Sequence, residues 1–123
     1  EGDLTHGISL AIDGDVYVLL RDGSILKYRR GELQSFEIKS QPSIPLKTPT
    51  RIFSLSEHRL LYVLDSALKR IVVYTKDDSG SSQYQKQIVF EDLQENEIVD
   101  FYVDTEEQNL VVLTDDKVYI TDL

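Results

Sequence analysis

Three residue types are missing from this 123-residue sequence: cysteine, methionine and tryptophan. The lack of cysteine excludes disulfides, thiolate metal sites and cysteine nucleophiles. No apolar run approaches the ~18 residues that a membrane-spanning helix needs, so we expect no direct membrane insertion. Because even an initiator methionine is missing, we expect a processed product or a segment of a longer protein.

Positive charge is also scarce, with 13 Lys and Arg against 22 Asp and Glu and a formal net charge of −9. Nucleic acids and anionic membranes both bind through Lys and Arg, so neither is expected as a partner. The densest basic spot, Lys27, Arg29 and Arg30, is too small to recognise a nucleic acid. With 41% hydrophobic residues the chain is too apolar for a disordered segment, and its length suits one domain.

Hydrophobic periodicity predicts an all-β fold. No stretch keeps the apolar spacing of a helix over three turns, whereas short β-branched and aromatic runs alternate with turn residues. The first four runs are Ile8–Ile12, Val16–Leu20, Ser24–Tyr28 and Glu32–Ile38. The dipeptides between them are Asp13-Gly14, Asp22-Gly23 and Arg30-Gly31. Since Asp-Gly favours two-residue type I′ turns, we expect a four-stranded antiparallel meander.

The meander then repeats along the chain. Tyr17, in the second strand of the first unit, aligns with Tyr62 at an offset of 45 residues, and Tyr62 aligns with Val111 at an offset of 49. Periods in the forties with four strands per unit are typical of β-propeller blades. We therefore predict a β-propeller segment, 1–123, of about three four-stranded antiparallel blades. Blade 1 covers about 8–38, a linker 39–50, blade 2 about 51–90, and blade 3, without its outer strand, about 99–123.

Two patterns favour blades over a two-layer sandwich. Val16–Leu20 and Leu60–Leu64 are apolar at consecutive positions, which predicts strands buried on both faces. A blade that lies between two neighbours meets that condition. All three prolines lie in the linker 39–50, where they predict an irregular crossover between blades.

Three blades would leave two apolar blade faces open, and soluble monomers avoid exposing such faces. Because closed propellers have ~4–8 blades, we expect half of a six-bladed ring. Either a second copy, forming a homodimer, or a missing N-terminal half would complete the ring. A stable, well-folded monomer would count against both.

The second unit resembles the core of an NHL repeat: the run Leu61–Tyr74 contains a strand, Asp65, a small turn, Arg70 and a further strand. The wider sequence is similar to the C-terminal propeller of a bacterial type 2C protein-phosphatase-like family from candidate-phyla bacteria, in the runs Ala11–Leu19, Asp22–Tyr28, Pro49–Phe53 and Val118–Ile120. That resemblance implies an extracytoplasmic propeller, tethered by an upstream membrane helix to a cytoplasmic phosphatase-like domain. None of the phosphatase's metal-binding aspartates is carried over to this chain.

If strands a to d run outward from the propeller axis, the b–c turns and d–a linkers share one face, where propellers usually bind. The candidate ligand face there consists of Asp22, Asp65, Arg70, Asp115 and Asp116. Its acidity suits a cationic peptide, a sugar or a metal more than a phosphate. The alternatives are that the loop acids only keep the protein soluble, and that Asp65 and Arg70 form a structural pair in an Asx-type turn.

Residues suited to catalysis are few. His6 and His58 have no partner at a metal-ligand spacing, so we expect two solvated loop histidines. Asp77–Ser82 lacks the alternating acids and final Glu of a calcium loop, which predicts a flexible hairpin tip. No catalytic residue, metal site or cofactor is predicted.

These observations predict a non-catalytic binding, sensing or scaffold module of a larger signalling protein, with a protein, peptide or sugar as its ligand. The alternative is half of a six-bladed hydrolase or lyase of the gluconolactonase type, in which acidic side chains hold a central metal. Such an enzyme needs several carboxylates at the ends of the inner strands, and Asp100 is the one candidate.

Overall fold

The computed structural model describes residues 3–77 and 79–123, and it confirms an all-β fold with propeller-like blades. Blade 1 consists of β1 (Gly7–Ile12), β2 (Val16–Leu20), β3 (Ile25–Arg29) and β4 (Glu32–Gln34). Blade 2 consists of β6 (Pro49–Phe53), β7 (Leu60–Asp65), β8 (Arg70–Thr75) and β10 (Tyr84–Val89). Blade 3 consists of β11 (Ile98–Val103), β12 (Asn109–Thr114) and β13 (Val118–Asp122), preceded by the short 3-10 helix η1 (Glu91–Leu93).

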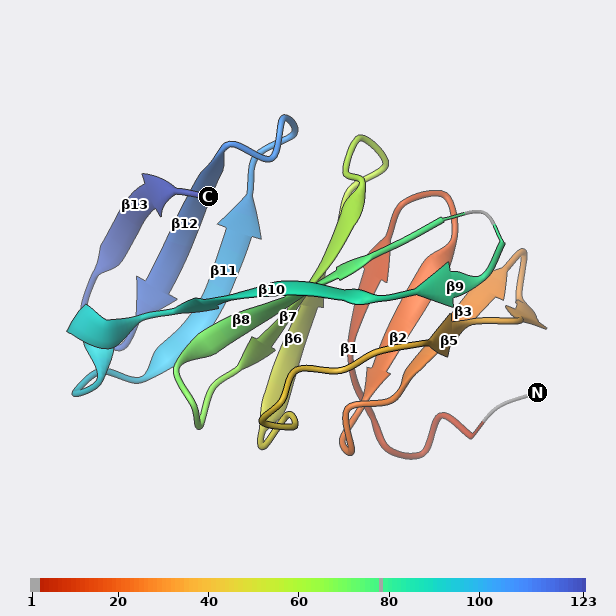
Figure 1. Ribbon diagram of the computed structural model, residues 1–123, viewed down its shortest axis with the longest axis horizontal. Coiled ribbons are helices and arrows are strands. Elements are labelled where there is room, and N and C mark those ends of the chain that lie inside the picture. Colours follow the sequence, from red (N-terminus) through yellow and green to blue (C-terminus); the bar gives the residue numbers. More distant parts are fainter. Residues whose placement is uncertain (1–2, 78) are drawn as a thin grey trace.

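Within each blade the strands pair in the order in which they follow one another along the chain, and all pairs are antiparallel. Figure 1 shows the three sheets standing side by side. The b–c turns lie along the lower edge of this view and the a–b turns along the upper edge. The two sets of loops are therefore separated as the repeat predicts.

A two-residue type I′ turn is found at Arg30-Gly31, whereas the turn at Asp13-Gly14 differs from the expectation. Arg30 and Gly31 have φ values of 53° and 81° and form the two-residue type I′ connection between β3 and β4. The loop between β1 and β2 is longer and spans Asp13–Asp15. There Asp13 Oδ1 accepts the backbone N–H of Asp15 at 3.0 Å. An Asx turn, and not a type I′ hairpin, therefore closes that loop.

The outer strand of blade 1 does not run unbroken over 32–38 as expected. β4 ends at Gln34, and β5 (Glu37–Ile38) leaves blade 1 to pair in parallel with β9 (Ser81–Ser82) in the c–d connection of blade 2. Gly80 permits this approach, because its φ is 86° and a Cβ there would lie 2.5 Å from the Ser35 carbonyl oxygen. The β5–β9 pair, called the strap below, joins the outer parts of blades 1 and 2 (Figure 1).

Each inner strand carries a bulge-like irregularity at the same place. Its register against the next strand shifts between Gly7 and Ser9, between Pro49 and Arg51, and between Ile98 and Asp100. Bulges bend a strand and increase its twist, so the three blades share a backbone shape as well as a sequence pattern. Pro49 begins β6 inside the expected linker, at the edge of its sheet, where a missing N–H is tolerated.

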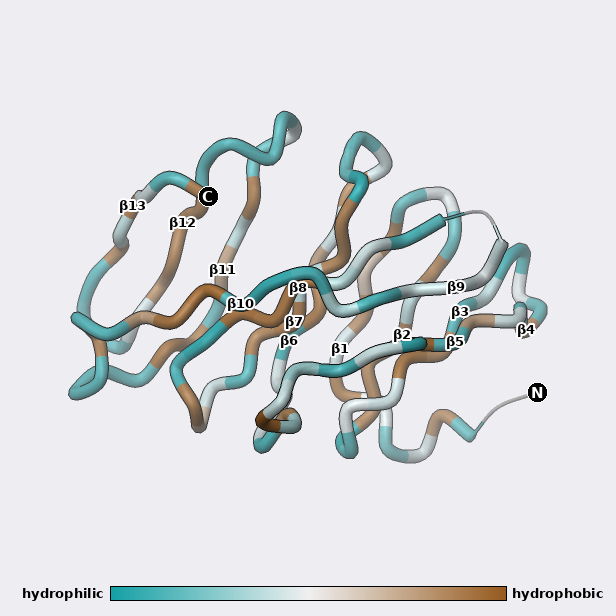
Figure 2. Tube along the Cα trace, viewed as in Figure 1, coloured by the Kyte–Doolittle hydropathy of each residue, from teal (hydrophilic) through white to brown (hydrophobic). Residues whose placement is uncertain are grey.

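Two hydrophobic cores fill the two junctions between blades. The core between blades 1 and 2 contains Ala11, Tyr17, Leu19, Ile25, Ile52, Leu61, Val63, Val72 and Tyr74. The core between blades 2 and 3 contains Tyr62, Leu64, Ile71, Val73, Phe90, Leu93, Ile98, Phe101, Val103, Leu110 and Val112. Successive residues of β7 and β8 enter opposite cores, so these strands are buried on both faces, as predicted, and they are hydrophobic along much of their length in Figure 2.

In blade 1 the same kind of run is buried on one face. Tyr17 and Leu19 of β2 are buried, whereas Val16, Val18 and Leu20 are partly exposed. The expectation of two-sided burial for Val16–Leu20 is therefore wrong in this structure. The physical reason is that no element of the described chain covers the far face of blade 1.

Candidate functional site

Asp65 and Arg70, from the candidate ligand face, form a buried ion pair at the b–c turn of blade 2. Their side chains are 0% and 3% exposed, and Arg70 Nε donates to Asp65 Oδ2 at 3.0 Å. Asp65 also accepts the backbone N–H groups of Lys47 and Thr48 at 3.1 and 2.8 Å. The Arg70 guanidinium donates to further oxygens in the linker. Both side chains therefore hold the linker against blade 2. This is the structural role that the sequence analysis gave as the alternative to ligand binding.

The exposed aspartates of that face lie in separate turns. Asp22 Oδ1 accepts the N–H of Ser24 at 2.9 Å, and this hydrogen bond holds the pKa of Asp22 below its usual range. In the b–c turn of blade 3, Asn96 Nδ2 donates to Asp115 and Asp116 at 3.3 Å each. The structure thus places Asp22 in a turn of blade 1 and Asp115 with Asp116 in a turn of blade 3, where each makes local contacts.

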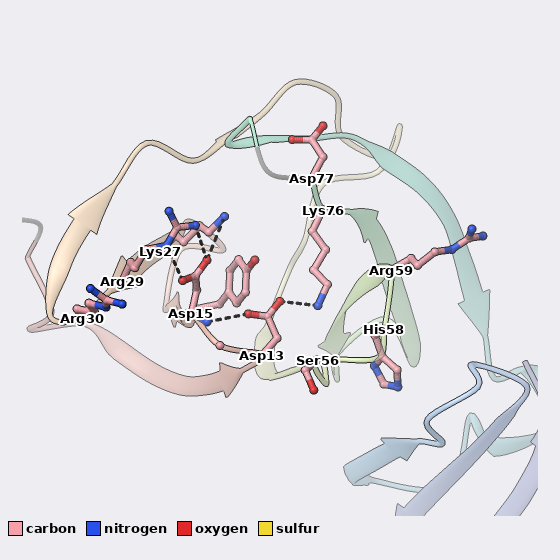
Figure 3. Close-up of a pocket in the computed structure, with 12 residues that line it drawn as sticks. Asp13, Asp15, Lys27, Arg29, Arg30, Ser56, His58, Arg59, Lys76 and Asp77 are labelled. Carbon is pink, nitrogen blue, oxygen red and sulfur yellow. Dashed lines mark hydrogen bonds and ion pairs between the residues drawn. The ribbon is translucent and has the colours of Figure 1, made fainter.

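A cleft of about 670 Å³ lies at the opposite edge, between blades 1 and 2. Its charged lining residues are Asp13, Asp15, Lys27, Arg29, Arg30, Arg59, Lys76 and Asp77. They come from the a–b and c–d connections of both blades and, for Lys27 and Arg29, from β3 itself (Figure 3). The strand order of the repeat predicts Asp13, Asp15 and Arg59 on this edge, but not a cleft that joins them to Lys27 and Lys76.

A partly buried ion pair crosses this cleft. Lys76 Nζ donates to Asp13 Oδ2 at 2.6 Å and to the Leu55 carbonyl at 3.1 Å. The side chains of Lys76 and Asp13 are 8% and 12% exposed. Figure 3 shows Lys76 extending from blade 2 toward the Asp13 turn of blade 1. The pair therefore fastens blade 1 to blade 2.

A second charged group lies on blade 1. Arg29 binds Asp15 through two hydrogen bonds, from Nε at 2.9 Å and from Nη2 at 3.1 Å. Lys27 Nζ lies farther from the same carboxylate, at 3.5 Å from Oδ2, and 5.6 Å from the centre of the Tyr17 ring. The guanidinium lowers the pKa of Asp15, whereas burial and the neighbouring Asp13 raise the pKa of Tyr17.

His58, expected to be solvated, is 4% exposed. Its Nδ1 accepts the N–H of Leu55 at 3.1 Å, and its Nε2 lies 2.7 Å from the carbonyl oxygen of Asp104 in blade 3. Because Nδ1 is an acceptor, Nε2 carries the proton of a neutral ring. His58 therefore fastens the a–b turn of blade 2 to blade 3. His6 is exposed, as expected.

Glu107 makes a further connection between blades 2 and 3. Its carboxylate accepts the Tyr62 hydroxyl at 2.7 Å and the backbone N–H groups of Arg59 and Leu60 at 2.9 and 3.2 Å. Burial and this carboxylate together raise the pKa of Tyr62. Glu107 therefore joins the a–b turn of blade 3 to Tyr62 and to the start of β7 in blade 2.

Within the segment that the sequence predicts to be a flexible hairpin tip, Ser81 and Ser82 pair with β5 in the strap. Asp77 Oδ1 accepts the N–H groups of Ser79 and Ser81 at 3.0 and 3.2 Å, and its hydrogen bonds, chiefly to Ser79, lower the pKa of Asp77. Asp78 lies outside the described residues. Within residues 3–77 and 79–123, no group of three or more histidines or acids is arranged to hold a metal ion.

Asp100, the candidate for a central metal ligand, lies just after the bulge of β11. Its Oδ1 accepts the N–H of Phe101 at 2.8 Å and lies 3.7 Å from Arg51 Nε of blade 2. The equivalent positions after the other two bulges are Ser9 and Arg51. Among the described residues there is no helix long and apolar enough to cross a membrane.

A comparison with solved structures found a similar fold in a protein from Lactobacillus plantarum, a crystal structure from a structural genomics consortium. The TM-score is 0.65 at 14% identity, and the match covers 93% of this chain and 37% of that one. The likeness therefore concerns the fold alone, and this chain spans little more than a third of that protein's length. Neither the protein-family models nor the curated proteins gave a match.

Proposed function

We propose that this chain is a non-catalytic binding or scaffold module whose two terminal blade faces each bind a further blade. The observation that carries the proposal is a mismatch between sequence and burial. β2 has the consecutive apolar residues of a strand covered on both sides, like β7, yet it is covered on one side. A partner surface resembling a blade would remove that mismatch.

The open face of blade 1 is continuous across its strands. Leu10, Val18 and Leu26 are direct cross-strand neighbours and form one apolar row. A second row on the same face consists of Ile12, Val16, Tyr28 and Leu33. Side chains of Leu10 and Ile12 are 58% and 59% exposed. Contiguous apolar surface of this kind marks interaction sites.

The open face of blade 3 has the same construction. Tyr102, Val111 and Ile120 are cross-strand neighbours, and Leu113 pairs with Val118 in the adjoining row. Ile120 is 73% exposed and Val118 is 63% exposed. The chain therefore ends in an apolar blade face on each side, and both faces match the kind of surface that the inner blade buries.

Two copies of three blades would make six, within the ~4–8 blades of closed propellers. Further blades of a longer chain would cover the faces equally well, and the similar crystal structure is that of a much longer chain. Either partner presents the same chemistry, an apolar sheet face. In both cases the module acts by association and not by a reaction of its own.

The inner strands also support a non-catalytic module over a lactonase-like enzyme. A central metal needs several converging carboxylates or histidines. The three equivalent positions after the bulges hold Ser9, Arg51 and Asp100, so one in three is acidic, and that one lies beside a guanidinium.

The resemblance to the phosphatase-like family supports a role in sensing. We propose that the full protein is a signalling protein with the propeller on the extracytoplasmic side of a membrane. The upstream part of the gene tests this proposal. A phosphatase-like region followed by a membrane helix would support it, and an upstream sequence without them would contradict it.

The substitution Ile120→Asp tests the open faces. Ile120 lies midway along β13, the outer strand of the exposed blade 3 face, so a charge there should prevent a second blade from packing. Ile44→Asp is the matched control, because Ile44 is 61% exposed in the linker, away from both blade faces. Light scattering coupled to size-exclusion chromatography gives the mass, and circular dichroism reports folding.

We expect the unaltered chain and the Ile44→Asp variant to run as dimers whose Tm rises with protein concentration. Ile120→Asp should run as a folded monomer at the same concentration. A stable, well-folded monomer of the unaltered chain, with a Tm independent of concentration, would contradict the proposal.

A further inference from the structure

We propose that the cleft between blades 1 and 2 is an anion-binding site that takes the carboxylate or phosphate group of a small ligand, with Lys27 and Arg30 as the binding side chains. The cleft lies on the a–b edge, opposite the candidate ligand face. Its volume of about 670 Å³ is within the ordinary range for small-molecule sites, ~300–1,000 Å³. The inference is independent of how the open blade faces are covered.

The charge of the cleft is opposite to that of the chain. Among the described residues, five basic side chains and three carboxylates line it, which is an excess of two positive charges in a chain of formal charge −9. The overall field of the protein repels anions, so an anion would gain here from local contacts and not from long-range attraction. Such a site suits a compact oxyanion and not an extended polyanion.

The carboxylates that are closest to Lys27 are already bound by other cations, so the charge of Lys27 is poorly neutralised. Asp13 is taken by Lys76, and both oxygens of Asp15 are taken by Arg29. Lys27 has the remaining contact with Asp15, at 3.5 Å, and its side chain is only 5% exposed. Among the described residues, this ammonium group with three N–H donors is therefore nearly buried against one long contact with Asp15, the Tyr17 ring and the charge of Asp77.

Burial of a cation is unfavourable unless acceptors replace its hydration. An oxyanion that enters the cleft would supply them, because carboxylate and phosphate oxygens form short, charge-assisted hydrogen bonds with ammonium and guanidinium groups. Arg30 is exposed at the c–d turn beside Lys27's strand and has no ion-pair partner within the described residues. It can therefore close on the same anion from the rim.

The wall of the cleft leaves room for the ligand. Gly14 lies in the lining, and a Cβ built on it would meet no atom within 4 Å. The Tyr17 ring beside Lys27 offers an apolar surface for the carbon atoms of an organic anion. The amide of Gly14 is thus a suitable reporter for a ligand in this space.

The test is a titration of the full chain with inorganic phosphate, with succinate and with glucose at constant ionic strength, followed by amide chemical shifts. Lys27→Met keeps the apolar part of the side chain and removes the charge. Arg30→Gln changes an exposed turn residue, so it remains informative if Lys27→Met unfolds. Lys86→Met, on the exposed outer strand β10, is the matched control.

We expect phosphate or succinate, but not glucose, to shift the Gly14 amide in a saturable way, with weaker binding at higher salt. Lys27→Met should weaken binding about tenfold, the size of one charge-assisted hydrogen bond, and Arg30→Gln should weaken it less. Saturation by phosphate alone or by succinate alone would identify the oxyanion and support the site. No saturable shift with either anion, or equal binding by the Lys27→Met or Arg30→Gln variant and the unaltered chain, would overturn the proposal.

Discussion

The pair Asp65–Arg70 shows how a residue of apparent functional interest can serve the fold. The two side chains are five positions apart, in a pattern that fits either a ligand-facing turn or a structural pair, and the linker folds over them and buries both. A carboxylate at 0% exposure is stable there because Arg70 and two backbone N–H groups bind it. We therefore expect substitutions of Asp65 or Arg70 to lower the stability of the folded chain.

Replacing Arg70 by leucine should destabilise the chain by about 3–5 kcal/mol, because Asp65 would remain buried without its cation. Arg29→Leu is the control, since the Arg29 side chain is 52% exposed in its pair with Asp15, and the expected cost is about 0–1 kcal/mol. Urea unfolding measures both. Similar losses for the two variants would refute a structural role specific to the buried pair.

Tyr74 predicts how stability responds to alkaline pH. Its hydroxyl donates to Gln41 Oε1 at 2.8 Å, and burial raises the pKa of Tyr74 to about 12 from the ordinary 10.0. The folded state favours the neutral phenol, so its contribution is fully present below pH 10.0 and is lost as the pH rises toward about 12. Tyr17 and Tyr62, whose pKa values are also raised, act in the same direction.

We therefore expect the free energy of unfolding to fall with pH over that alkaline window. Tyr74→Phe removes one titrating group and one hydrogen bond, so it should lower stability by about 1 kcal/mol at neutral pH and make the alkaline loss shallower. Denaturant unfolding at a series of pH values measures this. An unchanged slope in the variant would show that Tyr74 does not contribute.

At the scale of elements, the strap is the feature that departs most from a regular blade. It depends on Gly80, whose positive φ and close contact with the Ser35 carbonyl leave no space for a side chain. Gly31 has a similar φ of 81° but open space around it. The two glycines thus separate the effect of backbone conformation from the effect of the strap.

Gly31→Ala should cost about 1–2 kcal/mol, the ordinary penalty of a left-handed conformation. Gly80→Ala should cost more, because its Cβ would also push β5 away from β9. Hydrogen exchange at the Glu37 and Lys39 amides, which donate to the Gly80 and Ser82 carbonyls, reports on the strap. Equal penalties with unchanged protection of these amides would contradict this role for Gly80.

At the scale of the whole molecule, repetition made the architecture predictable. The offset from Tyr17 to Tyr62 and the consecutive apolar runs identified blades and placed the hairpins, because strand burial and turn chemistry are local signals. The common bulge of the inner strands was not predictable, since one extra residue in a ladder leaves no distinct composition.

The cleft and the connections between blades were beyond sequence reasoning. Lys76 and Asp13 are 63 positions apart, and His58 meets the Asp104 carbonyl across 46 positions. Such contacts depend on how one blade is rotated against the next, which no short pattern records. The candidate ligand face follows from the expected order of the strands, whereas the cleft between blades 1 and 2 lies at the other edge.

The pairing of β5 with β9 joins blade 1 to blade 2 by hydrogen bonds in addition to the proline-rich crossover. β5, which precedes the crossover in the sequence, is hydrogen-bonded to β9 in the c–d connection of blade 2. A break in the peptide chain between residues 39 and 48 would thus leave two fragments that stay docked through the sheet pair, the shared core and the Lys76–Asp13 contact. The peptide linker is one of several connections between the two blades, so a chain that is cut in the linker should still assemble.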